Sequence, residues 1–232
     1  MRLAKYMASC GIASRRGCER IIDDEHVTVN GEKVRDPAFD VDPDKDVVLV
    51  KGEPAKPTEL VYYALNKPVG YTSSREDKHA KLLVNELVPS RPPVWSVGRL
   101  DRDTSGLLIM TNDGTLTQIL THPSYEKEKE YLLTTDTHFT DDQVSEARAG
   151  VPLVDGMIIP EAFEPVGGKT YRVVIHEGRN RLIRRFAAYF GKKTTMLSRT
   201  RVAGLELGDL KSGDYRILTP KEIATLTEGV TS

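Results

Sequence analysis

The first fifty residues carry short patterns of apolar and polar positions with clear boundaries. Apolar residues from Leu3 to Cys10 follow helical spacing, and Gly11 is a typical helix stop. A second helix is predicted to begin after Ser14, a favoured N-cap residue, and to continue through Ile22. Two short helices are therefore expected before residue 23.

Residues 27–34 alternate between apolar and polar side chains around the dipeptide Asn30-Gly31. This dipeptide accepts positive φ angles and predicts a type I′ hairpin. A further strand is expected over Val47 to Val50. Helix, helix, hairpin and strand together predict a small domain over residues 1–50, followed by a proline-containing linker over 51–60.

The remaining residues, 61–232, mix extended and helical patterns in an irregular order. Strands are expected at 61–65, 107–110, 131–135, 171–175 and 215–218, and helices near 82–87, 116–120, 141–149 and 181–189. This order does not fit repeated βαβ units. The fold class is therefore predicted to be α+β, with a larger domain built on a mixed, mostly antiparallel sheet flanked by helices and loops.

Composition narrows the classes of partner. The chain has 232 residues, with 33 Lys and Arg against 34 Asp and Glu, and a formal net charge of -1. This balance excludes a globally basic nucleic-acid binder, but it does not exclude a local basic patch. Its apolar runs are too short to span a bilayer, and the N-terminus lacks a secretory signal pattern, so we expect a cytoplasmic protein without membrane contact.

Charge is unevenly distributed along the chain. Residues 169–201 contain ten basic residues and one acidic residue, whereas residues 133–168 contain seven acidic residues and one basic residue. The basic stretch is interleaved with aromatic and aliphatic residues, which favours an ordered, partly buried element over a solvated face. Arginines held in that way suit phosphate recognition.

Several common kinds of site are excluded by spacing. The five histidines show no paired ligand spacing, so no metal site is expected, and two cysteines alone cannot close a zinc site. Gly167-Gly168-Lys169-Thr170 resembles the end of a phosphate-binding loop, but Phe163 occupies the position of its first glycine. Serine-hydrolase and dinucleotide-binding glycine motifs are also absent from the sequence.

The strongest chemical candidate is the charged segment Gly98 to Gly106, which precedes the apolar run 107–110. A carboxylate mounted before a buried strand is well placed for catalysis. The segment alone also fits an ordinary turn with exposed ion pairs. A second segment, Gly178 to Phe186, holds four arginines that can keep a desolvated aspartate ionised.

These segments, with Lys67-Pro68-Val69-Gly70 and Lys129-Glu130-Tyr131, resemble the RsuA-type ribosomal RNA pseudouridine synthases. Residues 2–34 are similar to the small RNA-binding domain first named for ribosomal protein S-four. The resemblance implies isomerisation of a chosen uridine in ribosomal RNA, with no cofactor and no metal. The implied partner is ribosomal RNA or a ribosome-assembly intermediate, and the residues around the motifs favour RNA of the large ribosomal subunit. We expect the protein to be a monomer.

The resemblance also assigns roles to residues. Asp101 is the implied catalytic residue, acting on the ribose as nucleophile or as base, with Asp103 as a loop-stabilising neighbour. Tyr131, Arg184 and Arg99 are implied to support the active site, with Tyr131 stacking on the base and Arg184 holding Asp101. The residues expected to bind RNA are Arg2, Lys5, Arg15, Arg16, Arg20, Asn30, Lys33, Lys67, Arg179, Arg181 and Arg185.

Two positions depart from the family pattern. Leu182 stands where a glutamine is usual, and Glu25-His26 stands where a glycine commonly precedes the first hairpin strand. Two other hypotheses stay open: a non-catalytic RNA-binding ribosome-assembly factor, and a glycosidase-like pair of Asp101 and Asp103. Alternate positions on an extended segment point to opposite faces, which argues against a shared carboxylate site.

Overall fold

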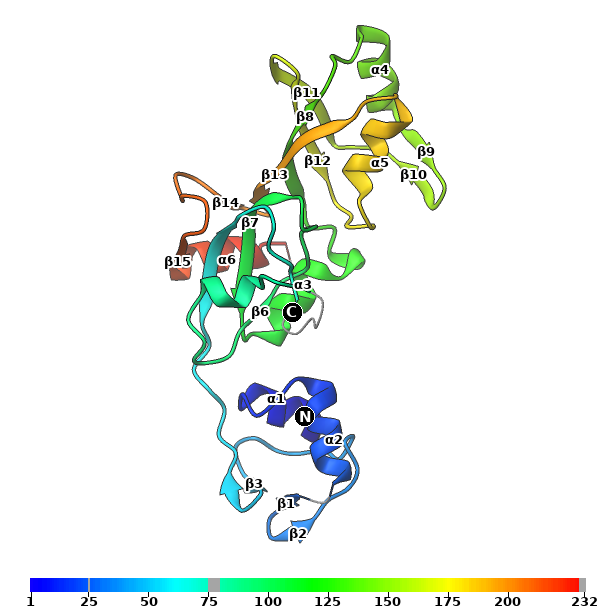
Figure 1. Ribbon diagram of the computed structural model, residues 1–232. Coiled ribbons are helices and arrows are strands. Elements are labelled where there is room, and N and C mark those ends of the chain that lie inside the picture. The colour runs from blue at the N-terminus through cyan, green and yellow to red at the C-terminus, as the bar shows by residue number, and fades with distance from the viewer. Residues whose placement is uncertain (25, 75–79, 230–232) are drawn as a thin grey trace. The chain divides into compact units, whose positions relative to one another are not determined.

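The computed structural model describes residues 1–24, 26–74 and 80–229, which form two compact units (Figure 1). The first unit comprises residues 1–61 together with 91–93 and 112–114, and the second comprises the rest. Glu25, one of the two departures from the family pattern, lies outside the described residues. Each unit is described by itself.

The first unit contains two helices and a four-stranded antiparallel sheet with the order β2-β1-β3-β4. Its elements are α1 (Leu3–Ser9), α2 (Arg15–Asp23), β1 (Val27–Val29), β2 (Glu32–Lys33), β3 (Val48–Val50) and β4 (Glu53–Pro54). Ser14 caps α2 by accepting a hydrogen bond from the Gly17 amide at 3.1 Å. Asn30 and Gly31 have φ angles of 53° and 88°, which is the predicted type I′ geometry.

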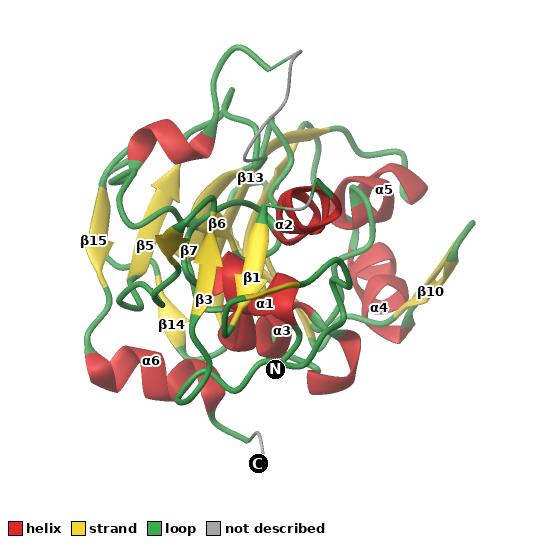
Figure 2. Cartoon of the chain, turned by 90° about the horizontal axis from the view of Figure 1, so that it is seen from below, coloured by secondary structure: helices red, strands yellow, loops and turns green. Residues whose placement is uncertain are grey.

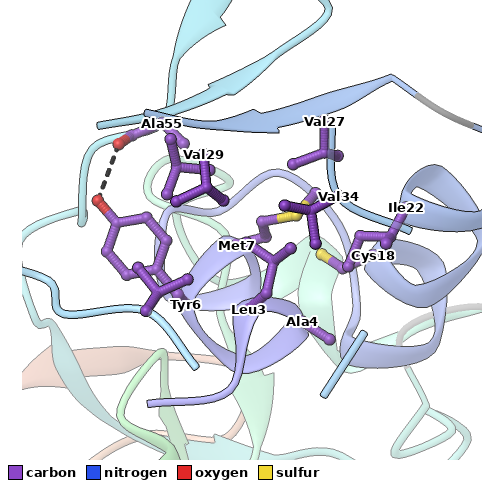
Figure 3. Packing of buried hydrophobic residues seen from close by; sticks show 12 residues of the cluster. Leu3, Ala4, Tyr6, Met7, Cys18, Ile22, Val27, Val29, Val34 and Ala55 are labelled. Atoms are coloured by element: carbon purple, nitrogen blue, oxygen red, sulfur yellow. Dashed lines mark hydrogen bonds between the residues drawn. The ribbon is translucent and has the colours of Figure 1, made fainter. Parts of the chain in front are cut away.

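Apolar side chains from both helices and from the sheet form the core of this unit (Figure 3). Met7 of α1 and Ile22 of α2 are fully buried beside Val27 of β1. The Tyr6 hydroxyl donates to the Ala55 carbonyl at 3.0 Å. Part of the segment expected to be a linker, 51–60, is thus an edge strand and a core contact. Proline is tolerated in β4 because an edge strand leaves one row of amides unpaired.

The second unit is built on one nine-stranded sheet with the main order β11-β12-β8-β13-β7-β5-β15. In addition, β14 pairs with β13 and β6 pairs with β7. Its strands are β5 (Tyr62–Lys67), β6 (Trp95–Ser96), β7 (Ser105–Thr111), β8 (Lys129–Thr135), β11 (Ala162–Gly167), β12 (Thr170–Ile175), β13 (Thr194–Val202), β14 (Leu205–Glu206) and β15 (Tyr215–Ile217). Figure 2 shows β15, β5 and β7 side by side. β13 and β7 are parallel and the other pairs are antiparallel, so the predicted mixed, mostly antiparallel sheet is confirmed.

Helices and a separate hairpin flank this sheet. These elements are η1 (Val84–Leu87), α3 (Gly114–Thr121), η2 (Pro123–Tyr125), α4 (Asp141–Ala149), the hairpin of β9 (Val151–Leu153) and β10 (Gly156–Ile158), α5 (Leu182–Tyr189) and α6 (Pro220–Thr227). α5 packs against β9 and β13, and α4 packs against β11. η1 is a 3₁₀ turn where an α-helix was expected near 82–87. The fold is confirmed as α+β with helices around the larger sheet.

β13 is a central strand that the apolar pattern did not predict. It joins the two halves of the sheet, because it pairs with β8 on one side and with β7 on the other. Arg199 of β13 lies opposite Gly106 of β7 and opposite Tyr131 of β8. A Cβ atom on Gly106 would lie 2.2 Å from the Arg199 carbonyl oxygen, so only glycine permits this close approach. The Gly98–Gly106 segment enters the sheet at this junction.

Candidate active site

The loop that carries Asp101 is held by hydrogen bonds from the side chain of Lys67, the last residue of β5. The Lys67 ammonium donates to the carbonyls of Thr104 at 2.8 Å, Pro68 at 3.0 Å and Asp101 at 3.1 Å. The Gly70 amide adds a bond to the Arg102 carbonyl at 2.7 Å. The end of β5 and the residues after it therefore fix the loop backbone at Asp101 and at the residues that follow Asp101.

Lys67 was expected to bind RNA, and the structure contradicts this. Its side chain is 0% exposed and all three bonds described above go to backbone carbonyls. Burial lowers the Lys67 pKa to about 8, against the opposing attraction of the Asp101 and Asp103 carboxylates. Lys67 cannot reach a phosphate from this position. Its hydrogen bonds instead stabilise the backbone of the Asp101 loop.

Asp101 and Asp103 differ in their partners although they are two residues apart. The Asp103 carboxylate accepts a bidentate pair of bonds from Arg181 at 3.0 and 2.9 Å, and this holds its pKa below the usual value. The Asp101 carboxylate is 30% exposed and lies 3.8 Å from Nη1 of Arg181. Asp103 is thus tied to its guanidinium, while Asp101 keeps oxygen atoms open to a ligand.

Arg184 was expected to hold Asp101, and the geometry gives that position to Arg181. Nη2 of Arg184 donates to the Asp103 carbonyl at 2.7 Å, and its Nε lies 3.3 Å from the Asp103 carboxylate. Both contacts fix the loop at Asp103, two residues after Asp101. The reason is the start of α5: Arg181, with φ 48°, precedes the helix and extends toward the loop. Leu182, the departure from the family pattern, is buried at the first position of α5.

Asp101 opens into a cavity of about 250 Å³, to which Tyr131 and Arg99 also contribute. Its walls are Arg99, Leu100, Asp101, Thr104, Tyr131, Ile175, Glu177, Gly178, Arg179, Asn180, Arg181, Leu182, Ile183 and Leu197. Tyr131 is 8% exposed and comes from the strand beside β13. The structure therefore brings Asp101, Tyr131 and Arg99 to one site, while Arg184 supports the loop from outside the cavity.

We call Arg179, Arg181 and Arg185 the loop arginines. Arg185 makes a bidentate pair with Asp155 at 2.7 and 2.8 Å, and Arg179 bonds Asp155 as well as Glu177. Asp155 lies in the turn of the β9-β10 hairpin. Asp155 of the acidic stretch is thus a main partner of the basic stretch. Arg179 and Arg181 line the cavity, whereas Arg185 lies outside its wall.

The residues of the first unit expected to bind RNA are exposed, and they fall into two kinds. Arg2, Lys5 and Lys33 lie on the surface, as do Arg15, Arg16 and Arg20, which we call the α2 arginines. Within the described chain, the guanidinium groups of the α2 arginines make no hydrogen bond and no ion pair, so their charge faces solvent. Asn30 is different, because its side-chain amide bonds Asp46 and the Val47 backbone at 2.9 Å each and fixes the hairpin.

One buried and one partly buried cation near the site were not among the predicted site residues. Arg199 of β13 is 3% exposed, and Lys129 of β8 has a pKa lowered to about 8 by burial and by the charge of Arg199. The available signal was the spacing of Lys129 and Tyr131, two residues apart and therefore on one face of β8.

The described residues lack two features that are typical of other kinds of protein. Among the described residues, no three His, Cys, Asp or Glu side chains are grouped in a way that suits a metal ion. The helices within residues 1–24, 26–74 and 80–229 include none with the length and apolarity for a membrane span.

Two family models match the chain. The model described as RNA pseudouridylate synthase covers residues 61–189, and the model described as S4 domain covers residues 1–48. The chain belongs to the RNA pseudouridylate synthase family, as an RsuA-type member with an S4 domain. The predicted class of enzyme, an isomerase that forms pseudouridine in RNA, is thereby confirmed.

Relatives agree with this assignment over nearly the whole chain. An uncharacterized RNA pseudouridine synthase of Aquifex aeolicus (strain VF5) is 37% identical over 99% of this chain and 95% of its own length. The dual-specificity RNA pseudouridine synthase RluF of Salmonella typhi is 36% identical over 97% of this chain and 78% of its own length. A crystal structure of a pseudouridylate synthase superposes with a TM-score of 0.71 at 28% identity, over 97% of this chain and 99% of that chain.

Proposed function

We propose that this enzyme converts one chosen uridine of large-subunit ribosomal RNA to pseudouridine, with Asp101 as the catalytic carboxylate. The observation that carries the proposal is the cavity that holds Asp101 and Tyr131 together, with the Asp101 loop fixed by Lys67. A carboxylate that retains open oxygen atoms suits an attack on the ribose, either as nucleophile or as base. We expect the enzyme to act as a cytoplasmic monomer on ribosomal RNA or on an assembly intermediate.

The reaction moves the base without adding or removing atoms. The bond between uracil N1 and ribose C1′ breaks, a bond between C5 and C1′ forms, the C5 proton leaves and N1 ends protonated. Asp101 acts at the ribose, while the Tyr131 ring provides a face for the uracil in the cavity. A cavity of about 250 Å³ with a largely buried tyrosine also limits water around the base.

Access to the cavity requires the uridine to leave its stack. Extrusion of a base costs a few kcal/mol, which contacts with the RNA backbone must offset. The α2 arginines suit this role because their charge is exposed and they have no partner in the described chain. We propose residues 1–50 as the RNA-binding domain and 61–232 as the catalytic domain, joined through 51–60. Two tethered contacts then raise the effective concentration of the substrate.

The test is pseudouridine mapping after incubation of the purified enzyme with unmodified transcripts of both ribosomal RNAs. We expect one new pseudouridine, in the large-subunit transcript. A pseudouridine confined to the small-subunit transcript would overturn the subunit assignment, and the absence of pseudouridine from both would overturn the ribosomal substrate. If both transcripts stay unmodified but bind tightly, the assembly-factor hypothesis is favoured.

A further inference from the structure

A second cavity of about 690 Å³ lies beside the Asp101 cavity. The two cavities share five wall residues: Arg99, Tyr131, Glu177, Gly178 and Arg179. Apolar side chains of Val97, Ile109, Leu120 and Val202 form part of the second cavity's wall. Its volume falls in the range of small-molecule sites, about 300 to 1,000 Å³. The space is therefore large enough for a nucleotide, and Tyr131 lines both this cavity and the one that holds Asp101.

Two cations line this second cavity: Arg199, which is buried, and Lys129, which is partly buried. The Arg199 side chain makes one hydrogen bond within the described chain, from Nε to the Leu107 carbonyl at 2.8 Å. The Lys129 ammonium donates to the carbonyls of Lys127 at 2.9 Å and His176 at 3.2 Å. Neither cation forms an ion pair with a carboxylate of the described residues. Each therefore keeps a positive charge that no carboxylate of the described residues pairs with.

The acidic residues of the cavity leave these charges uncompensated. Glu177 is paired with Arg179 through two bonds, and the exposed Glu126 uses its backbone carbonyl to bond His176. Buried charges without a partner are costly, and the cost is recovered when an anion binds. Proximity of Arg199 adds to the lowering of the Lys129 pKa, which shows that the two charges repel one another. An anionic group between them would relieve this repulsion.

We propose that the second cavity binds a nucleotide adjoining the target uridine, with its base on the apolar wall and its phosphate at Lys129 and Arg199. When an RNA strand places the target uridine against Tyr131, the nucleotide next to that uridine lies within reach of the second cavity, because Tyr131 lines both cavities. A nucleotide has a base that can pack on the apolar side chains of the cavity and a phosphate that can bind its two cations. The inference rests on the proposed function and extends it to a residue of the RNA beyond the target.

The test combines one protein substitution with one change in the RNA. The substrate is an RNA fragment that contains the uridine mapped with the wild-type enzyme, with an abasic nucleotide placed at either adjoining position in turn. Lys129→Met removes the charge and keeps the length of the side chain. Lys127→Met is the matched control, because the Lys127 ammonium bonds the Glu228 carbonyl and does not line this cavity.

We expect Lys129→Met to raise KM about tenfold while kcat changes little, as for the loss of one charged contact. The slope of log affinity against log salt should fall by about 0.7, the value for one phosphate of a single strand. At one adjoining position, the abasic nucleotide should raise the wild-type KM severalfold and the Lys129→Met KM much less. Lys127→Met should behave as wild type in all three measurements.

Each part of the inference can fail separately. If wild-type KM is unaffected by abasic nucleotides at both adjoining positions, the second cavity does not hold a neighbouring base, whatever the variant does. If Lys129→Met leaves KM and the salt slope unchanged, the cation does not contact a phosphate. Failure of the wild-type enzyme to form pseudouridine at all would instead contradict the proposed function.

Discussion

The α2 arginines and the loop arginines are the same residue type in two different settings. The α2 arginines are exposed and unpaired within the described chain, whereas each loop arginine is bonded to a carboxylate. Unpaired surface arginines act over distance and release counterions from RNA. Paired arginines with bidentate geometry fix positions instead. The two groups therefore differ in what their charges do: the α2 arginines leave their charge exposed to solvent, and the loop arginines hold carboxylates in or near the Asp101 site.

The largest expected effect is a loss of stability on substitution of Gly106, the glycine at the start of β7 that lies opposite Arg199. Gly106→Ala places a Cβ 2.2 Å from the Arg199 carbonyl oxygen at a φ of 103°, so we expect a loss of unfolding free energy of about 3 kcal/mol or more. Urea denaturation measures this loss. The matched control is Gly31→Ala in the first unit, where φ is 88° but no atom lies within 4 Å of the added Cβ. Its cost should be about 1 kcal/mol, and equal costs would show that close packing at Gly106 is unimportant.

The next prediction concerns kcat and RNA affinity, which should respond differently to substitution in the two groups of arginines. Arg181→Met removes the bidentate support of Asp103 and the cation nearest Asp101, so we expect kcat to fall about 100-fold with little change in RNA affinity. Single-turnover assays at saturating enzyme isolate this step. Arg216→Met is the control, since Arg216 is paired with Glu222 and lines neither cavity. A loss of RNA affinity with unchanged kcat would place Arg181 among the residues that attract RNA.

The α2 arginines should show the opposite pattern. Replacing Arg15, Arg16 and Arg20 together by glutamine is expected to weaken RNA binding about tenfold at moderate salt and to lower the salt slope by about 2. The kcat at saturating RNA should not change. Binding isotherms at several salt concentrations give both values, with Lys45→Gln as a control on an exposed loop of the same unit. An unchanged salt slope would contradict a role for α2 in contacting phosphates.

The smallest effect concerns Lys67 and pH. Its pKa is about 8 in the folded protein and 10.5 in the unfolded chain, so the unfolded state binds more protons between these pH values. The stability of wild type relative to Lys67→Met should therefore rise with pH, by about 1 kcal/mol between pH 7 and 9. Urea denaturation at each pH measures the difference. Lysine ¹³C NMR on the wild type gives a second readout, and titration of Lys67 near 10.5 would contradict its burial.

Local signals in the first unit predicted its two helices, its first hairpin and β3, but not β4. Ser14 caps α2 and Asn30-Gly31 forms the hairpin turn, because both depend on residues adjacent in the chain. The edge strand β4 was missed although it pairs with β3 across the two-residue turn Lys51-Gly52, because Glu53 and Pro54 are residue types that are uncommon in strands. The contact of Tyr6 with Ala55 was also missed, because it joins residues that are distant in the chain.

In the second unit, the polar composition of β13 concealed a central strand. Its residues Ser198 to Arg201 alternate serine, arginine and threonine, yet Arg199 is buried through pairing with β7 and β8. Motifs located the Asp101 loop and Tyr131, which the structure brings into one cavity. They could not show that Lys67 is buried or that Arg181, rather than Arg184, is nearest Asp101, because these facts depend on how β5, the loop and α5 meet.

The central claim is that Asp101 performs the chemistry and the arginines around it do not. Asp101→Asn keeps the shape of the side chain and removes its charge, so RNA affinity should stay close to that of wild type. Single-turnover formation of pseudouridine on the mapped RNA should fall more than about 1,000-fold. Pseudouridine formation at a rate near that of wild type, in a variant that binds RNA normally, would contradict the assignment of Asp101.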